Sequence, residues 1–192
     1  MSSKEPKVMW GEGTPWKTQS EFYTYLRGCL RQAWMRHPNK IKVLQAKRYK
    51  VDRLDKDGNV MLDKKTGKPK QVWNCKCELC GHTGGMKDFQ VDHIHAAKAL
   101  QCFQDIPDFV LRLIYVKEED LRMVCKLCNS ILAYADKQGI SFEAAAVEKE
   151  AIAICQAKKD KKWLESKGVT PESTAAKRRK QIVQILLTER GL

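Results

Sequence analysis

Two cysteine pairs place the strongest constraint on the fold of this chain. Each pair has the C-x-x-C spacing, which presents two thiolates from one tight turn, and two such pairs supply the four ligands of a tetrahedral zinc ion. We therefore predict one structural Zn²⁺ bound by Cys77, Cys80, Cys125 and Cys128. Cys75 lies two residues before Cys77, a less usual spacing for zinc ligands, and is left out of the predicted site.

The other cysteines bear on the cellular compartment. The chain has 8 cysteines, which in a secreted protein would suggest disulfides. Its N-terminus carries no apolar segment typical of a secretory signal, so we expect a reducing cytoplasm and free thiols at Cys29, Cys102 and Cys155. No run of residues approaches the roughly 18 apolar residues of a membrane helix, and we predict no membrane partner.

The charge of the chain indicates a polyanionic partner. The net charge is +13, and the basic residues concentrate in two segments. Residues 27–53 contain nine basic residues and one acidic residue, and residues 158–180 contain nine and three. The alternative is that these side chains only keep a helical surface hydrated. The predicted nucleic-acid contacts are Arg27, Arg31, Arg36, Lys177, Arg178, Arg179 and Lys180.

Capping and breaking signals organise the N-terminal third. Thr18 and Glu21 form a capping box that predicts a helix start, and Pro38 predicts the end of that helix. A second short helix is expected over residues 39–47. Residues 49–73 alternate weakly between apolar and polar and contain turn signals, so we predict a charged hairpin or loop there.

The segment between the cysteine pairs predicts short strands and one helix, and a further helix follows the second pair. The expected order is a turn at residues 81–85, a strand from residue 88 that ends at Asp92-His93, a helix over residues 107–114, a strand over residues 121–124 and a helix over residues 129–137.

Two further helices are predicted near the C-terminus. The alanine-rich residues 142–164 predict one long helix. Thr170 as N-cap and Pro171 at the first helical position predict another, which runs to about Glu189. Its apolar face either packs on the rest of the chain or forms a surface for a protein partner or a homodimer; that face consists of Ile182, Val183, Ile185, Leu186 and Leu187.

The order C-x-x-C, Asp92-His93, C-x-x-C, Asn129 resembles the HNH (ββα-metal) endonucleases, above all the phage enzymes that resolve Holliday junctions. The resemblance implies an α+β, mainly helical fold, in which a zinc-stabilised ββα-metal core carries helical extensions at both termini. We divide the chain into a flexible segment (1–17), a basic helical region with the hairpin or loop (18–72), the core (73–138) and C-terminal helices (139–192).

The resemblance also implies the roles of three residues. His93 would be the general base, while Asp92 and Asn129 would bind a catalytic Mg²⁺ or Mn²⁺ beside a DNA substrate. An imidazole can take a proton from water near neutral pH, and carboxylate and amide oxygens suit hard divalent ions. Adjacent strand residues point to opposite sides, so Asp92 and His93 are expected to act together only at an irregular strand end.

The predicted function is therefore a metal-dependent DNA endonuclease, acting in the host cytoplasm for a phage-encoded protein. Three positions differ from the common HNH pattern, namely Asp120, Leu132 and Ala133. They favour the alternative of a nucleic-acid-binding or host-factor-binding protein with a degenerate, inactive HNH fold.

Overall fold

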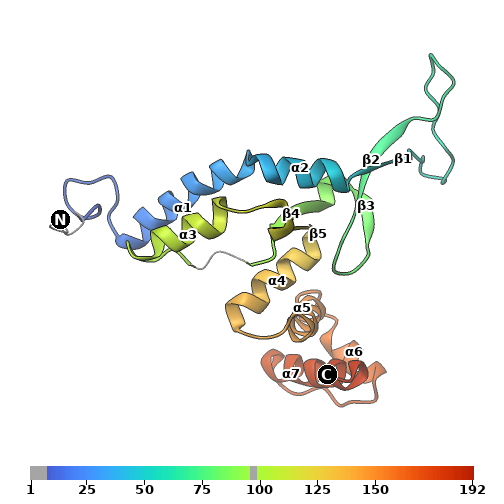
Figure 1. The fold of residues 1–192 in the computed structure, drawn as a ribbon. Coiled ribbons are helices and arrows are strands. Elements are labelled where there is room, and N and C mark those ends of the chain that lie inside the picture. Colours follow the sequence, from blue (N-terminus) through green and yellow to red (C-terminus); the bar gives the residue numbers. More distant parts are fainter. Residues whose placement is uncertain (1–7, 96–98) are drawn as a thin grey trace. The chain divides into compact units, whose positions relative to one another are not determined.

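A computed structural model describes residues 8–95 and 99–192 and divides the chain into two compact units (Figure 1). The first unit ends at Cys125 and the second begins at Lys126. The described residues form an α+β structure with seven α-helices and two small antiparallel sheets, which confirms the expected mainly helical class. Within the described ranges, no helix has the length and apolar character needed to span a membrane.

The first two helices begin and end at the predicted signals. In α1 (Gln19–Met35), Thr18 Oγ1 accepts the Glu21 N–H at 3.2 Å, as the capping box requires. Glu21 Oε2 accepts the N–H of Lys17 at 2.7 Å, one residue earlier than in the usual box. The next helix, α2 (Pro38–Lys47), begins at Pro38 itself, because the first helical position needs no N–H donor.

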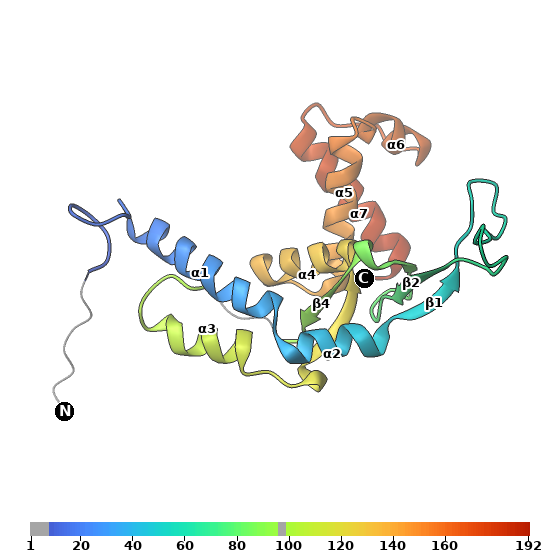
Figure 2. The same cartoon turned by 90° about the horizontal axis from the view of Figure 1, so that it is seen from above.

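Helices α1 and α3 (Asp105–Ile114) lie side by side in the first unit, as Figures 1 and 2 both show. Their core contains the buried side chains of Tyr23, Leu100, Phe109 and Leu113. Trp10 and Trp16, from the segment expected to be flexible, both contact the ring of Phe22 on α1. Residues 1–7 of that segment lie outside the described residues.

A three-stranded antiparallel sheet follows α2. Its order is β1-β2-β3, with β1 (Tyr49–Asp52), β2 (Gln71–Lys76) and β3 (Thr83–Gly85). The connection from β1 to β2 extends beyond both strands and is held by two isolated bridges, so residues 49–73 form a hairpin (Figures 1 and 2). The predicted turn at residues 81–85 is wrong in part, because Thr83–Gly85 pairs with β2 and only Gly81 has a positive φ, 71°.

A second, two-stranded ribbon carries the Asp-His pair. Strand β4 (Phe89–His93) pairs antiparallel with β5 (Leu121–Cys125), in a register that runs from Phe89↔Cys125 to His93↔Leu121. Helix α2 packs against both strands. Short 3₁₀ turns precede each strand, η1 (Met86–Asp88) and η2 (Glu118–Asp120). The two strands confirm the hairpin predicted between the cysteine pairs.

The second unit contains the remaining helices, namely α4 (Lys126–Gln138), α5 (Phe142–Gln156), α6 (Asp160–Ser166) and α7 (Ala175–Arg190). Ile182 and Leu186 of α7 pack against Val147, Ala151 and Leu164. Of the apolar face predicted for the last helix, Ile182 and Leu186 are therefore buried within this unit, and Val183, Ile185 and Leu187 are partly buried against the same core. Binding of a protein partner or a second copy through the C-terminal helices stays a prediction.

The predicted long helix over residues 142–164 is wrong, because α5 ends at Gln156 and α6 begins at Asp160. The break lies at Lys158, whose φ of 55° places it in the left-handed region. The N–H groups of Lys158 and Lys159 bond the carbonyls of Cys155 and Ile154, which is a Schellman motif. Glycine is usual at that position, so lysine gave no warning of the stop.

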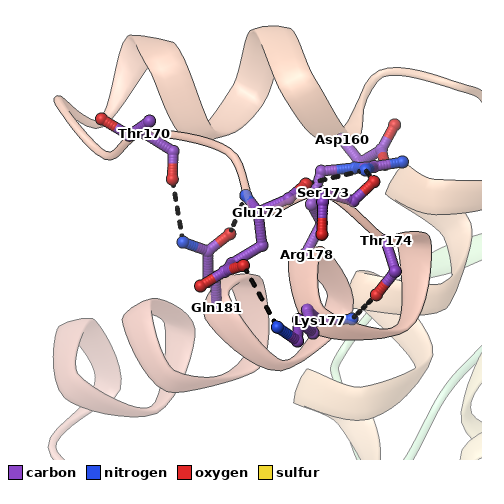
Figure 3. A network of polar contacts seen from close by, with 8 residues as sticks. All are labelled: Asp160, Thr170, Glu172, Ser173, Thr174, Lys177, Arg178 and Gln181. Carbon is purple, nitrogen blue, oxygen red and sulfur yellow. Dashed lines mark hydrogen bonds and ion pairs between the residues drawn. The ribbon is translucent and has the colours of Figure 1, made fainter.

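The start predicted at Thr170 is also wrong, because α7 begins at Ala175 with Thr174 as its N-cap. Figure 3 shows why the preceding residues stay outside the helix. Arg178 Nη1 donates to the carbonyls of Glu172 and Ser173 at 2.9 Å, and Gln181 Nε2 donates to the carbonyl of Thr170 at 2.9 Å. Side chains of α7 thus satisfy carbonyls that would otherwise bond helical N–H groups.

Candidate metal centre and its surroundings

The four cysteines of the two C-x-x-C pairs come together. Their sulfur atoms all lie within 4.8 Å of one another, and the set is Cys77, Cys80, Cys125 and Cys128. A tetrahedral site with Zn–S bonds of about 2.3 Å has S–S edges of about 3.8 Å. The Cys80 and Cys125 sulfurs are 3.8 Å apart, so the arrangement fits a zinc ion. Cys75 is fully buried and lies outside this set, as expected.

The surroundings of Cys77 favour the thiolate that zinc requires. Burial raises the pKa of Cys77, but backbone N–H groups of Cys125, Cys80 and Leu79 donate to its sulfur and prevail. The pKa of Cys77 is thereby lowered to about 6. A thiolate stabilised by N–H donors is ready to bind metal at neutral pH.

Glu78, inside the first cysteine pair, joins that pair to β5. Its N–H donates to the Met123 carbonyl at 2.9 Å, and its Oε1 accepts the Met123 N–H at 2.6 Å. Lys47 of α2 donates to the same carboxylate oxygen at 2.5 Å. These bonds hold the first pair beside the strand that carries Cys125. Sequence reasoning missed Glu78, because its main partner is a backbone group 45 residues away.

His93 lies on the buried face of the β4–β5 ribbon. His93 is 9% exposed, and its ring centroid lies 4.1 Å from that of Trp34. Nε2 is 3.1 Å from the Leu113 carbonyl oxygen. Because a carbonyl can only accept, Nε2 carries the proton and Nδ1 the lone pair.

Electrostatics keep His93 in its neutral form. Burial lowers the pKa of His93, and this effect outweighs the Leu113 carbonyl and the Asp92 carboxylate, which raise it. His37 and Lys40 also lower the pKa. A neutral imidazole with a fixed tautomer is the form that a general base requires.

Asp92 faces the opposite side of the ribbon. It lies across from Arg122, whose Nη2 is 3.5 Å from Asp92 Oδ2, and the two side chains are 26% and 17% exposed. Burial raises the pKa of Asp92, and the Arg122 guanidinium opposes that shift. The strand stays regular through His93, since Ile94 N–H still bonds the Asp120 carbonyl at 2.8 Å. The irregular strand end that joint action of Asp92 and His93 would require is therefore not found.

A surface pocket of about 290 Å³ opens beside His93. Asp120 lines the same pocket, whereas Asp92 does not. Asp120 Oδ2 accepts the N–H of Lys117 at 2.8 Å, which holds its carboxylate in place. The other lining residues are His95, Asp108, Leu111, Arg112, Tyr115 and Val116.

The third predicted catalytic residue, Asn129, is half-buried on α4 and directly follows Cys128. It belongs to the second unit, whereas Asp92 and His93 belong to the first. Its role beside Asp92 on one divalent ion stays a prediction.

The predicted nucleic-acid contacts differ in their availability. Arg31 and Arg36 are exposed on or beside α1, and Arg27 donates to Thr24 Oγ1 at 2.8 Å. On α7, by contrast, most of the charge has internal partners. Arg178 Nε bonds Asp160 at 2.6 Å, Arg179 bonds Glu148 and the Tyr134 hydroxyl, and Lys177 lies 3.7 Å from Glu172. Lys180 is exposed.

Comparison with family models, with curated proteins and with solved structures finds no match for this chain. The residues and their geometry therefore carry the functional argument by themselves.

Proposed function

We propose that the chain is a metal-dependent DNA endonuclease of the HNH type with a structural zinc ion. One observation carries the proposal. The strand that holds Asp92 and His93 pairs antiparallel with β5, and β5 runs directly into α4 through Cys125, Cys128 and Asn129. This order of hairpin, cysteine pair and helix is the one that the HNH resemblance implies.

The side chains suit hydrolysis of a phosphodiester. His93 is held neutral, with the Nδ1 lone pair available to take a proton from an attacking water. Asp92 and Asn129 would hold Mg²⁺ or Mn²⁺ through their oxygen atoms. Such an ion supplies Lewis-acid stabilisation of the charge that develops on the phosphate. The four thiolates leave no open position on zinc, so the zinc ion only supports the fold.

Nicking of supercoiled plasmid by the zinc-loaded protein, with added Mg²⁺ or Mn²⁺, tests the proposal. His93→Gln is the sharpest variant, because a glutamine amide can still donate to the Leu113 carbonyl but cannot act as a base. We expect the cleavage rate to fall by about 10²- to 10⁴-fold with unchanged zinc content. His93→Ala is less informative, since it orphans that carbonyl and leaves a cavity beside Trp34.

His37→Gln is the matched control. His37 Nε2 also lies 2.9 Å from a backbone carbonyl, that of Ile114, but His37 does not line the pocket. The same substitution there should leave cleavage within a few fold of the wild type. If His93→Gln cuts as well as the wild type, His93 is not the base.

A nucleic-acid-binding protein with an inactive site is the second candidate. Asp92 and His93 point to opposite sides of a regular strand, and Asp92 already pairs with Arg122, which favours this reading. A wild type that binds DNA but cuts neither duplex, branched nor single-stranded DNA with either ion would establish it.

A further inference from the structure

The β1–β2 hairpin carries exposed cations that lack ion-pair partners. Within the part of the chain that the structure describes, none of them forms a salt bridge. These residues are Lys50, Arg53, Lys56, Lys64, Lys65 and Lys68. Their charges are therefore available to a partner outside the chain.

Two of the four acidic residues of the hairpin, Asp55 and Asp63, are used in its turns. Asp55 Oδ1 accepts the N–H groups of Asp57 and Asn59, each at 2.9 Å. Asp63 Oδ1 accepts those of Lys65 and Thr66, each at 3.0 Å. These backbone donors hold the pKa of Asp55 and Asp63 below its usual range. The two carboxylates thus shape the turns and do not pair with the lysine side chains.

Trp73 on β2 holds Lys50 and one further cation, Arg48, at the base of the hairpin. The Arg48 guanidinium carbon lies 4.1 Å from the Trp73 ring centroid, and Lys50 Nζ lies 5.4 Å from it. The ring is 39% exposed, and Lys50 is its cross-strand neighbour. Cation–π contacts restrict these side chains before a partner arrives, which lowers the entropic cost of binding.

The basic segment of α7 has the opposite character. Figure 3 shows Arg178 directed to Asp160 and to the carbonyls of Glu172 and Ser173, with Lys177 beside Glu172. Arg178 is therefore bonded within the second unit, and Lys177 already has an acidic neighbour on its surface. The densest basic run in the sequence is consequently less available than the hairpin.

We infer that the β1–β2 hairpin, with Arg48 and Trp73 at its base, is a DNA-binding surface that contacts the phosphodiester backbone. Unpaired cations spread along an extended hairpin are complementary to a polymer with regularly spaced negative charge. The inference rests on the DNA partner of the proposed function, but it does not require cleavage.

A triple substitution tests the inference, with Lys64→Gln, Lys65→Gln and Lys68→Gln combined in the full-length zinc-loaded protein. Its affinity for a fluorescent duplex of about 20 base pairs is measured between about 50 and 300 mM salt, because binding through phosphate contacts weakens over this range. Each lost phosphate contact lowers the slope of log Kd against log salt concentration by about 0.9, so we expect a decrease of about 2–3.

The matched control combines Lys159→Gln, Lys161→Gln and Lys162→Gln. These lysines are also exposed, and the control changes the net charge equally. It should keep the wild-type slope. An equal decrease in both variants would overturn the inference, because net charge alone would then explain binding. A hairpin variant with the wild-type slope and affinity would also overturn it.

Trp73→Leu gives a second, charge-neutral measurement. It removes the ring that positions Arg48 and Lys50, so affinity for DNA at physiological salt should fall at least about threefold. The number of phosphate contacts need not change. Unchanged affinity would remove Trp73 and Arg48 from the surface. If the protein binds DNA through the hairpin but does not cut it, this inference stands and the endonuclease proposal fails. If the protein cuts DNA and the hairpin variant binds DNA like the wild type, the endonuclease proposal stands and this inference fails.

Discussion

At the scale of single residues, His93 combines a packing role with the proposed chemistry. Burial against Trp34 requires an uncharged ring, and the uncharged ring is also the basic form. The Leu113 carbonyl selects the tautomer. The same contacts that stabilise the fold would therefore prepare the side chain for the proposed proton transfer.

The lowered pKa of His93 predicts a pH dependence of stability. Its pKa is about 6.5 when unfolded and lower when folded, so protons bind the unfolded state first as pH falls. This contribution is fully present above pH 6.5 and is lost as pH falls through the folded pKa. The loss should approach about 1.4 kcal/mol per pH unit.

Urea unfolding of the wild type and of His93→Gln, at several pH values between about 7.5 and 5.5, measures the contribution of His93 to the unfolding free energy. Zinc ligands titrate in both proteins, so the difference between the two curves isolates His93. The difference in unfolding free energy between the wild type and His93→Gln should become smaller or change sign toward low pH, because only the wild type loses the His93 contribution. Parallel curves would show that His93 is not the titrating group.

Sequence reasoning succeeded where chemistry requires a fixed local spacing. The four cysteines met as predicted, because each pair acts through one turn. It did not reveal Arg122 beside Asp92 or the Leu113 carbonyl beside His93, since those contacts depend on strand register and on the packing of α3. The preference for Arg178 as a DNA contact likewise overlooked a partner, Asp160, that is 18 residues away.

At the scale of elements, the strongest local signals were the reliable ones. The Thr18 N-cap of α1, the hairpin strands and the apolar face of α7 were all predicted and found. Helix ends were predicted less well where the determining contact is not local. Lys158 stops α5 without a glycine, and side chains within α7 itself delay its start to Ala175.

The ion pair between α6 and α7 gives the second stability prediction. Asp160 and Arg178 bond at 2.6 Å with both side chains 11% exposed, and Arg178 holds the pKa of Asp160 below its usual value. Arg178→Met leaves a nearly buried carboxylate without its partner, so we expect a loss of about 3 kcal/mol of unfolding free energy.

Urea denaturation followed by far-ultraviolet circular dichroism measures that loss. Lys180→Met, two residues further along α7 and exposed, is the control and should change stability by less than about 0.5 kcal/mol. Similar losses in both variants would mean that the general charge of α7, and not the pair with Asp160, supports the unit.

At the scale of the whole molecule, the two units differ in what stabilises them. The core of α5, α6 and α7 consists of aliphatic side chains and contains none of the four clustered cysteines. In the first unit, by contrast, Cys77 directly follows β2, Cys125 ends β5, and Glu78 bonds the backbone of Met123 on β5. Short strands bury little apolar surface, so a metal ion bound by the four cysteines would carry much of the stability there.

Loss of zinc should therefore affect the two units unequally. Cys125→Ser removes one ligand, and we expect it to abolish the binding of one zinc per chain and to unfold the β4–β5 ribbon, because zinc sites of this kind are commonly unfolded without metal. The helical signal of the second unit should persist and melt separately.

Cys29→Ser, at an exposed cysteine outside the cluster, should retain both zinc and a wild-type melting curve. Elemental analysis and circular dichroism measure both variants. A well-folded wild type that contains no metal would end the zinc assignment, and a single cooperative loss of all helix in Cys125→Ser would show that the second unit depends on the first.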